Sequence, residues 1–398
     1  MKIRKVIPPA AAPIPLRDFL RGIYGIIDKN ERGKREVEFK EYFGTENVFL
    51  VSSGKAALFL ILSALKSLCD RTKVIIPAYT CYSVPSAVIK AGLKVVPCDI
   101  RPETLDYDFD KLKTLIDDDT LCIIPTHLFG IPSDVNRIRD ICEDKKIYIL
   151  EDAAQALGVT VGERKVGTLG DVGFFSLGRG KNITCGSGGI IVAYSQNIAE
   201  VLRNLCTSLR SEPFREYMAN IISVALMSVF INPYLYWFPH GLPFLKIGET
   251  KFYKDFPVFR LSGFKAGLLR HWRNTLDSYN RIRSEFGEYY LRKLNLKGTL
   301  PIYSFPFPYL RFPIYVDNNE LKGAYDDYRS FGITRMYPDS VNNIDEIKGQ
   351  FIGSNCRNAE YIAETLLTLP SHYLIKDQDR MNIIKIANNM MTRSSAII

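Results

Sequence analysis

Between about residues 47 and 195, short β-branched runs alternate with longer stretches in which apolar residues recur at helical spacing. KVIIP, LCIIPTHL and GIIVAY predict buried strands, while KAALFLILSALKSL and VNRIRDICEDK predict helices. Strands and helices that take turns are typical of a mainly parallel sheet covered by helices on both faces. The sequence therefore predicts a three-layer α/β domain whose chemistry lies in loops at the carboxyl ends of the strands.

The pattern changes between about 213 and 250, where ANIISVALMSVFINPYLYWFPHGLPFL is apolar, aromatic and interrupted by prolines. Its uninterrupted part, Ile221 to Ile231, forms a helix of roughly 17 Å, against roughly 30 Å of bilayer hydrocarbon. We expect 217–245 to dock on the cytoplasmic face of a membrane or on a membrane-bound partner, with Trp237 at the lipid interface. In the open alternative, the segment completes a dimer interface or covers the active site.

A long helical pattern follows from about 261 to 294. LRFPIYV then predicts a strand, and further helices are predicted at 319–330 and near 355–368. These elements suit a smaller C-terminal α/β domain joined to the first by the long helix. We expect a large domain over 1–260, which includes the insertion-like segment, and a small domain over 261–398.

Composition narrows the classes of function. The 398 residues are 46% hydrophobic and 24% charged, as in ordinary globular proteins. The net charge of +9 is spread along the chain, which argues against a nucleic-acid arm but suits a phosphorylated substrate or an anionic membrane face. Eight scattered cysteines, and prolines that interrupt VIPPAAAPIP where a signal peptide would need a helix, favour a cytoplasmic protein. The histidines lack ligand spacing, so no metal site is expected.

The candidate catalytic residues lie in two segments, IYILEDAAQALG and GDVGFFSLGRGKNITCGSGGIIV. Asp152 ends a predicted buried strand. Lys181 follows 29 residues later in a glycine-rich loop, where packing gives no reason for a lysine. A desolvated lysine amine with a lowered pKa is a nucleophile at neutral pH and can move protons. This pair is therefore the candidate catalytic centre.

Four segments share one order and spacing: SSGKAAL at 52–58, PAYT at 77–80, EDAAQ at 151–155 and FSLGRGKNITCGSGG at 175–189. Together they resemble the DegT/DnrJ/StrS family of sugar-nucleotide aminotransferases, which are fold type I enzymes dependent on pyridoxal 5'-phosphate (PLP). The resemblance implies a homodimer that transfers an amino group, usually from glutamate, to a nucleotide-linked keto-sugar. Such reactions serve the biosynthesis of cell-surface polysaccharides and related glycans.

The resemblance also implies roles for single residues. Lys181 would hold PLP covalently and carry the transferred proton, and Asp152 would keep the pyridine nitrogen protonated. Gln155 matches a position packed against the cofactor ring. The cofactor phosphate would bind at a helix N-terminus and at one further hydroxyl, the candidates being Ser53, Gly54, Lys55, Ala56 and Ser176.

The chain departs from the family pattern at four positions. Lys55 replaces a threonine of the phosphate turn, and Cys81 replaces a ring-stacking aromatic that its neighbour Tyr82 could supply. Val258 stands where a partner subunit often offers an asparagine, and Ser187 replaces a glutamate. His127 matches a position near the family's active site, but a structural histidine fits it equally well.

Two other classes of function stay open. A PLP-dependent sugar dehydratase of the same fold is disfavoured, because those enzymes replace the lysine that is present here as Lys181. A non-catalytic or regulatory member of the family, docked to a membrane assembly, is the second alternative.

Overall fold

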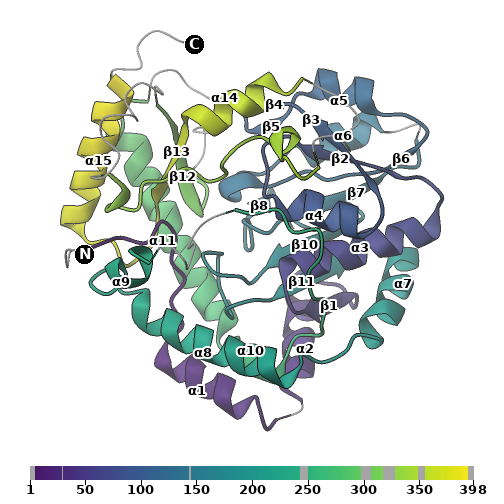
Figure 1. Cartoon of the computed structure of the whole chain (residues 1–398), viewed down its shortest axis with the longest axis horizontal. Coiled ribbons are helices and arrows are strands. Elements are labelled where there is room, and N and C mark those ends of the chain that lie inside the picture. The colour runs from purple at the N-terminus through teal and green to yellow at the C-terminus, as the bar shows by residue number, and fades with distance from the viewer. Residues whose placement is uncertain are drawn as a thin grey trace.

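A seven-stranded sheet forms the centre of the computed structural model, which describes residues 5–28, 30–142, 145–242, 250–296, 306–316, 328–347 and 355–392 (Figure 1). The strand order is β1-β11-β10-β7-β6-β2-β3, and only β11 runs against its neighbours. The strands are β1 (Val48–Val51), β2 (Lys73–Pro77), β3 (Lys94–Cys98), β6 (Thr120–Ile123), β7 (Tyr148–Asp152), β10 (Val172–Ser176) and β11 (Gly189–Ala193).

Helices cover both faces of this sheet because successive strand residues point to opposite sides. On β2, Ile75 joins one apolar core while Val74 and Ile76 join the other. The first core includes α2 (Glu31–Phe43), α5 (Phe109–Leu115), α6 (Val135–Ile141) and α10 (Gly263–Leu268). The second includes α3 (Gly54–Leu68), α4 (Ser83–Lys90) and α7 (Gln196–Thr207). The predicted three-layer, mainly parallel α/β fold is confirmed.

Short pairs of strands border the main sheet. They are β4 (Ile100–Arg101) with β5 (Asp106–Tyr107) and β8 (Thr160–Val161) with β9 (Arg164–Lys165). Two single turns of 3-10 helix, η1 (Leu128–Gly130) and η4 (Val341–Asn343), lie in connecting loops.

A third apolar core lies in the C-terminal part, around α11 (Trp272–Lys293), β12 (Arg311–Tyr315), α14 (Arg357–Thr365), β13 (Leu366–Pro370) and α15 (Asp377–Thr392). The start of α11 packs in the first core and its end in the third, so this helix joins the two bodies. The third core also takes Ile7, Tyr79 and Phe129 from the first part of the chain. The division into 1–260 and 261–398 stays our proposal.

Two helix predictions in this region were wrong in their bounds. The pattern at 261–294 is two helices, α10 and α11, separated at Leu269–His271. The helix expected near 355–368 ends at Thr365 and passes directly into β13, whose five residues are all buried. A short buried apolar run carries no period that distinguishes a strand from a helix. The helix predicted at 319–330 lies largely outside the described residues.

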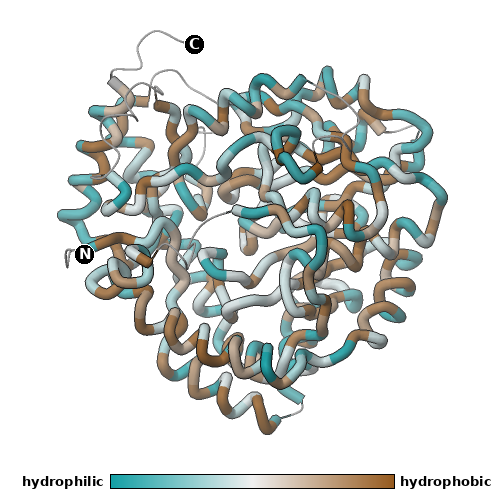
Figure 2. Tube along the Cα trace, in the orientation of Figure 1, coloured by the Kyte–Doolittle hydropathy of each residue, from teal (hydrophilic) through white to brown (hydrophobic). Residues whose placement is uncertain are grey.

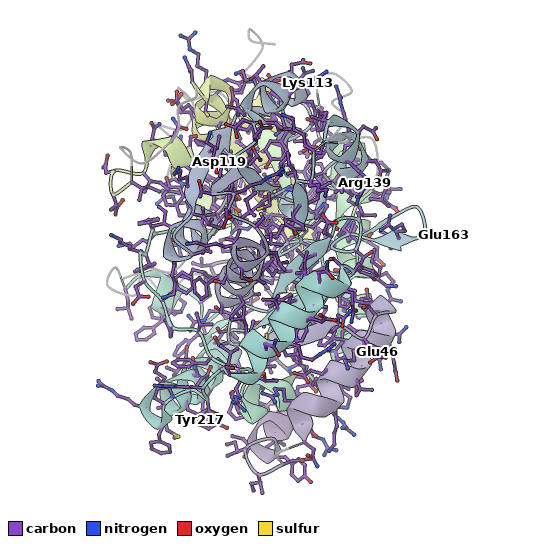
Figure 3. The ribbon with its side chains drawn as sticks, turned by 90° about the vertical axis from the view of Figure 1, so that its right-hand side faces the viewer. Glu46, Lys113, Asp119, Arg139, Glu163 and Tyr217 are labelled. Carbon is purple, nitrogen blue, oxygen red and sulfur yellow. The ribbon has the colours of Figure 1, made fainter. Side chains whose placement is uncertain are left out.

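The apolar segment forms α8 (Phe214–Phe230) and α9 (Trp237–His240), and residues 243–249 lie outside the described part. Among the described residues, no helix combines the length and apolar character needed to cross a bilayer. Figures 1 and 3 both place α8, on which Tyr217 lies, at the lower end of the molecule, and Lys113 lies near the upper end. The N-terminal helix α1 (Leu16–Tyr24) lies at the same lower end.

Helix α1 turns most of its large apolar side chains outward, while Phe19 packs inward against Phe264. It crosses α10 through glycines, and a Cβ at Gly22 or Gly267 would lie within 3.0 Å of the other helix. The inner face is therefore small, and Leu16 and Leu20 are 73% and 59% exposed. On α8, Ile222, Leu226 and Val229 are also exposed. Most exposed large apolar side chains among the described residues lie at 16–27 and 214–238, and Figure 2 shows the apolar character of both helices.

Candidate active site

The first helical turn after β1 forms a donor-rich cradle. Ser53 caps α3, because its hydroxyl oxygen accepts a hydrogen bond from the Ala56 N–H at 3.1 Å. A Cβ at Gly54 would lie 2.8 Å from the Cβ of Ser176, so this turn is pressed against the end of β10. First-turn N–H groups lack partners within their helix and attract anions. The structure thus brings together Ser53, Gly54, Ala56 and Ser176, which the sequence assigned to one phosphate site.

Lys55 projects from this turn toward aromatic rings. Its ammonium nitrogen lies 5.1 Å from the ring centroid of Tyr253 and 4.6 Å from that of Phe256. Burial lowers the pKa of Lys55, and the nearby Lys90 lowers it further, while Cys81 raises it. The departure from threonine therefore introduces a cation held over two rings beside the cradle.

Asp152, which ends β7, and the partly buried Lys181 lie within electrostatic range of each other. Asp152 is 5% exposed, and its Oδ1 accepts a hydrogen bond from the Ala154 N–H at 3.0 Å. Burial raises the pKa of Asp152, although the attraction of Lys181 opposes the rise. Burial lowers the pKa of Lys181, which Cys81 and Asp152 oppose and Arg311 reinforces. Burial disfavours the charged form of each residue. The attraction between Asp152 and Lys181 therefore does not fully compensate the two charges.

Helix α11 fixes the loop that carries Lys181. Arg283 donates from Nη2 to the Lys181 carbonyl at 3.3 Å and from Nη1 to the Asn182 carbonyl at 3.0 Å. Asn280, one turn earlier, accepts from the Asn182 side chain at 3.2 Å. Both α11 side chains are buried. Sequence analysis missed them, although polar residues spaced by three on the buried face of a helix would have marked them.

Gln155 is held between two parts of the chain. Its amide nitrogen donates to the Tyr337 hydroxyl at 2.9 Å, and its amide oxygen accepts from the Phe129 N–H at 3.2 Å. Tyr337 packs edge-to-face on Tyr79, with ring centroids 5.1 Å apart. Burial raises the pKa of Tyr337, and the nearby Cys81 and Asp152 raise it further. Tyr337 is therefore a site residue that sequence analysis missed, because it lies 182 residues after Gln155.

Cys81 and Tyr82 diverge. Cys81 is a partly buried free thiol within electrostatic range of Lys55, Lys181 and Tyr337. The Tyr82 hydroxyl instead donates to the Asp339 carbonyl at 3.4 Å. Tyr337, rather than Tyr82, is the ring beside Asp152 and Gln155.

The other family-like positions have mainly structural contacts. His127 Nε2 lies 2.9 Å from Glu151 Oε2, while its Nδ1 accepts from the Ser133 N–H at 3.1 Å. Both nitrogens are satisfied, which favours the structural interpretation of His127. The Ser187 hydroxyl donates to the Ser52 carbonyl at 2.6 Å. Val258 packs against the second core, and Arg260 donates to the Leu209 carbonyl.

Solved structures share this architecture along nearly the whole chain. Helicobacter pylori PseC, an aminotransferase involved in the biosynthesis of pseudoaminic acid, aligns with a TM-score of 0.77 and 16% identity, over 98% of this chain and 100% of that chain. The E. coli GDP-4-keto-6-deoxy-D-mannose-3-dehydratase with bound hydrated PLP aligns with a TM-score of 0.73 and 20% identity, over 96% and 100%. At these identities the likeness establishes the fold alone.

Relatives found by sequence include GDP-perosamine synthases. GDP-perosamine synthase of Vibrio cholerae is 32% identical over 177 residues, which are 44% of this chain and 47% of that protein. The chain spans about half the length of the curated relatives it matches. The sequence profile of one family, however, matches residues 26–387, and this confirms the resemblance carried by the four motifs. The chain belongs to the DegT/DnrJ/EryC1/StrS aminotransferase family.

Proposed function

We propose that this chain is a PLP-dependent aminotransferase that moves an amino group from glutamate onto a nucleotide-linked keto-sugar, in the biosynthesis of cell-surface polysaccharide. The observation that carries the proposal is the partly buried Lys181, whose pKa is lowered by burial, within electrostatic range of Asp152 at the carboxyl end of β7. Membership of an aminotransferase family and the likeness to GDP-perosamine synthases support it.

The residues present suit PLP. The cofactor has a phosphate, a ring nitrogen and an aldehyde, and the site offers the cradle at Ser53–Ala56, the Asp152 carboxylate and the Lys181 amine. Two buried hydroxyls, Thr80 Oγ1 and Thr126 Oγ1, have no hydrogen-bond partner among the described residues. Thr126 pairs with Asp152 through an isolated backbone β-bridge, and Thr80 lies in the loop after β2. A polar ligand in this region would satisfy groups that the protein leaves unpaired.

When bound, PLP supplies an electron sink for the reacting carbon. Asp152 supplies the fixed negative charge that keeps the ring nitrogen protonated, and its burial strengthens that interaction. The Lys181 amine, neutral at a lower pH than an ordinary lysine, accepts a proton and returns it at the neighbouring carbon. Arg283 holds the Lys181 backbone, while Gln155 and Tyr337 brace one another beside the same carboxylate. These contacts keep the amine in one position during proton transfer.

The presence of Lys181 favours an aminotransferase over a sugar dehydratase of the same fold. Sugar dehydratases that resemble this family replace the lysine, so their reaction is not the one we propose. A non-catalytic member that only binds PLP is the remaining alternative.

The proposal is tested by incubating the purified protein with PLP, glutamate and a panel of nucleotide-linked keto-sugars, with mass detection of amino products. An amino sugar formed only with the complete mixture is expected. Cofactor absorbance that glutamate and every keto-sugar leave unchanged would indicate the non-catalytic alternative. The same mixture run without glutamate is the control.

We further propose a cytoplasmic homodimer that docks on an anionic membrane through the outward faces of α1 and α8. Large apolar side chains on both faces favour an interfacial position over a purely aqueous one. Their exposed charged residues are Arg17, Arg21, Arg215 and Glu216, a net positive set. Asp18, whose carboxylate is buried against His271, lies 3.8 Å from Arg17 Nε and offsets part of this charge, but the set stays positive. Anionic headgroups match this combination of charge and apolar surface.

Changing Ile222, Leu226 and Val229 together to serine is expected to abolish sedimentation with vesicles that contain phosphatidylglycerol. The three side chains are exposed, so folding and PLP binding should persist. A matched control changes the exposed Val37, Tyr373 and Met381 to serine elsewhere on the surface. Wild-type protein that never sediments with these vesicles would rule out docking. A loss of self-association in the α8 variant would assign the face to the dimer.

A further inference from the structure

Arg311 begins β12 opposite Pro370 and carries few internal contacts. Its Nε donates to the Pro9 carbonyl at 3.3 Å, and its Nη1 approaches the Met336 sulfur at 3.2 Å. Thioether sulfur is a weak acceptor. Nη2 makes no hydrogen bond to any part of the chain that the structure describes. Much of the donor capacity of this guanidinium is therefore unused.

No carboxylate within the described ranges balances the charge of Arg311. Burial lowers its pKa to about 10, and the groups that oppose this are the hydroxyls of Tyr236, Tyr337 and Tyr79. These phenols are neutral at pH 7, because burial raises the pKa of each. The side chain nevertheless keeps partial exposure, so a ligand can reach it. A partly buried, uncompensated guanidinium favours an anion.

This cation belongs to the neighbourhood of the reacting amine. Its Nη1 contacts Met336, and the hydroxyl of the adjacent Tyr337 accepts a hydrogen bond from Gln155. The Leu310 N–H donates to the carbonyl of Phe129, whose own N–H donates to Gln155. Arg311 also lies within electrostatic range of Lys181. Tyr236, which follows α8 in the apolar segment, lies within electrostatic range of the same guanidinium.

The charges around Arg311 fit a carboxylate better than a diphosphate. Arg283 already donates to the Asn182 carbonyl and to Asn280. His372 is buried and held neutral, with its pKa lowered to about 4. Arg311 offers a fork of N–H groups that matches a singly charged, planar carboxylate. The cofactor phosphate has a separate cradle at the start of α3.

We propose that Arg311 is the receptor for the carboxylate of the amino donor, and holds it while the donor's amine faces Lys181. This inference rests on the proposed function and names the donor class, an amino acid. It assigns Arg311 a substrate-binding role that no motif in the sequence indicated.

The test uses the PLP-loaded protein and glutarate, a dicarboxylate that has no amine and cannot react. Calorimetry should give glutarate binding that weakens by about 100-fold in Arg311→Met, the loss typical of breaking a buried charge pair. Arg311→Lys should recover part of it, because a point charge remains without the fork. Arg380→Met is a matched control, since Arg380 lies over Phe286 in the same C-terminal part. The L-glutamate concentration for half-maximal amino transfer should rise in parallel.

A second readout reports where Arg311 lies. Its charge lowers the pKa of Lys181, so Arg311→Met should shift the pH profile of PLP capture by the unloaded protein to higher pH. A residue with only a structural role would leave that profile unchanged. The profile also shows whether the variant is folded, because capture needs an intact site.

The outcomes are separable. If Arg311→Met and Arg311→Lys bind glutarate like the wild type while amino transfer persists, the inference is wrong and the proposed function stands. If pyrophosphate binding depends on Arg311 and glutarate binding does not, the ligand is the diphosphate of the sugar nucleotide and the inference is also wrong. If glutarate binding depends on Arg311 but no amino product forms, the carboxylate receptor stands and the proposed function fails.

Discussion

Asp152→Asn is expected to lower the rate of amino transfer by at least about 100-fold, in line with the loss of one fixed electrostatic group in an active site. The amide is nearly isosteric and can still accept the Ala154 N–H, so folding and PLP capture should persist. A neutral side chain, however, cannot hold the ring nitrogen protonated. Rates are measured under saturating glutamate and keto-sugar, so that only the loss of turnover is compared.

The same variant has a signature in its pH dependence. The negative charge of Asp152 favours protonated Lys181 and so raises its pKa. Its removal should lower that pKa, and PLP capture, which needs the neutral amine, should extend to lower pH. This shift is opposite in sign to the one expected for Arg311→Met. The control is Asp106→Asn, which neutralises a partly buried carboxylate that accepts a hydrogen bond from the Ser133 hydroxyl. Near-wild-type turnover in Asp152→Asn would exclude Asp152 as the partner of the ring nitrogen.

Gly54→Ala is expected to weaken PLP binding by about 10- to 100-fold, which is the value of one hydrogen bond to a charged group. The added Cβ would lie 2.8 Å from Ser176 Cβ and 3.1 Å from its hydroxyl oxygen. Either the turn or the end of β10 must move, and the phosphate cradle loses its geometry. Titration of the unloaded protein with PLP, followed by absorbance, measures the change.

Gly33→Ala is the matched control for this change. Gly33 also lies in a helix, α2, and a Cβ there meets no atom within 4 Å. The control should bind PLP as tightly as the wild type. Equal PLP affinity in Gly54→Ala and Gly33→Ala would show that the turn before α3 does not form the phosphate site.

Much of the fold could be read from local pattern. Each strand of the main sheet has at least one residue in each of the two apolar cores that cover its faces. Runs of β-branched residues such as KVIIP are typical of strands buried on both faces. The antiparallel β11 was not foreseen, because an apolar run does not reveal the direction in which a strand runs. The outward apolar face of α1 was not foreseen either, since it depends on a glycine crossing with α10, far away in the sequence.

The residues of the site also fall into those that the local sequence pattern predicts and those that it does not. Ser53, Asp152 and Ser176 follow or end strands, where the sheet itself brings distant motifs to one edge. Tyr337, Arg283 and Arg311 come from the C-terminal part, whose packing against this edge has no local signal. Their roles became visible only through contacts such as the one between Gln155 and Tyr337.

Borohydride reduction of the PLP-loaded protein, followed by peptide mass mapping, identifies the lysine that holds the cofactor. We expect one reduced cofactor per chain, attached to the peptide that contains Lys181, and none in Lys181→Arg, which keeps the charge but not the reactive amine. Lys55, the other partly buried lysine near the cradle, is the internal comparison. A label on Lys55 or any other lysine, with residue 181 unmodified, would exclude Lys181 as the residue that holds the cofactor.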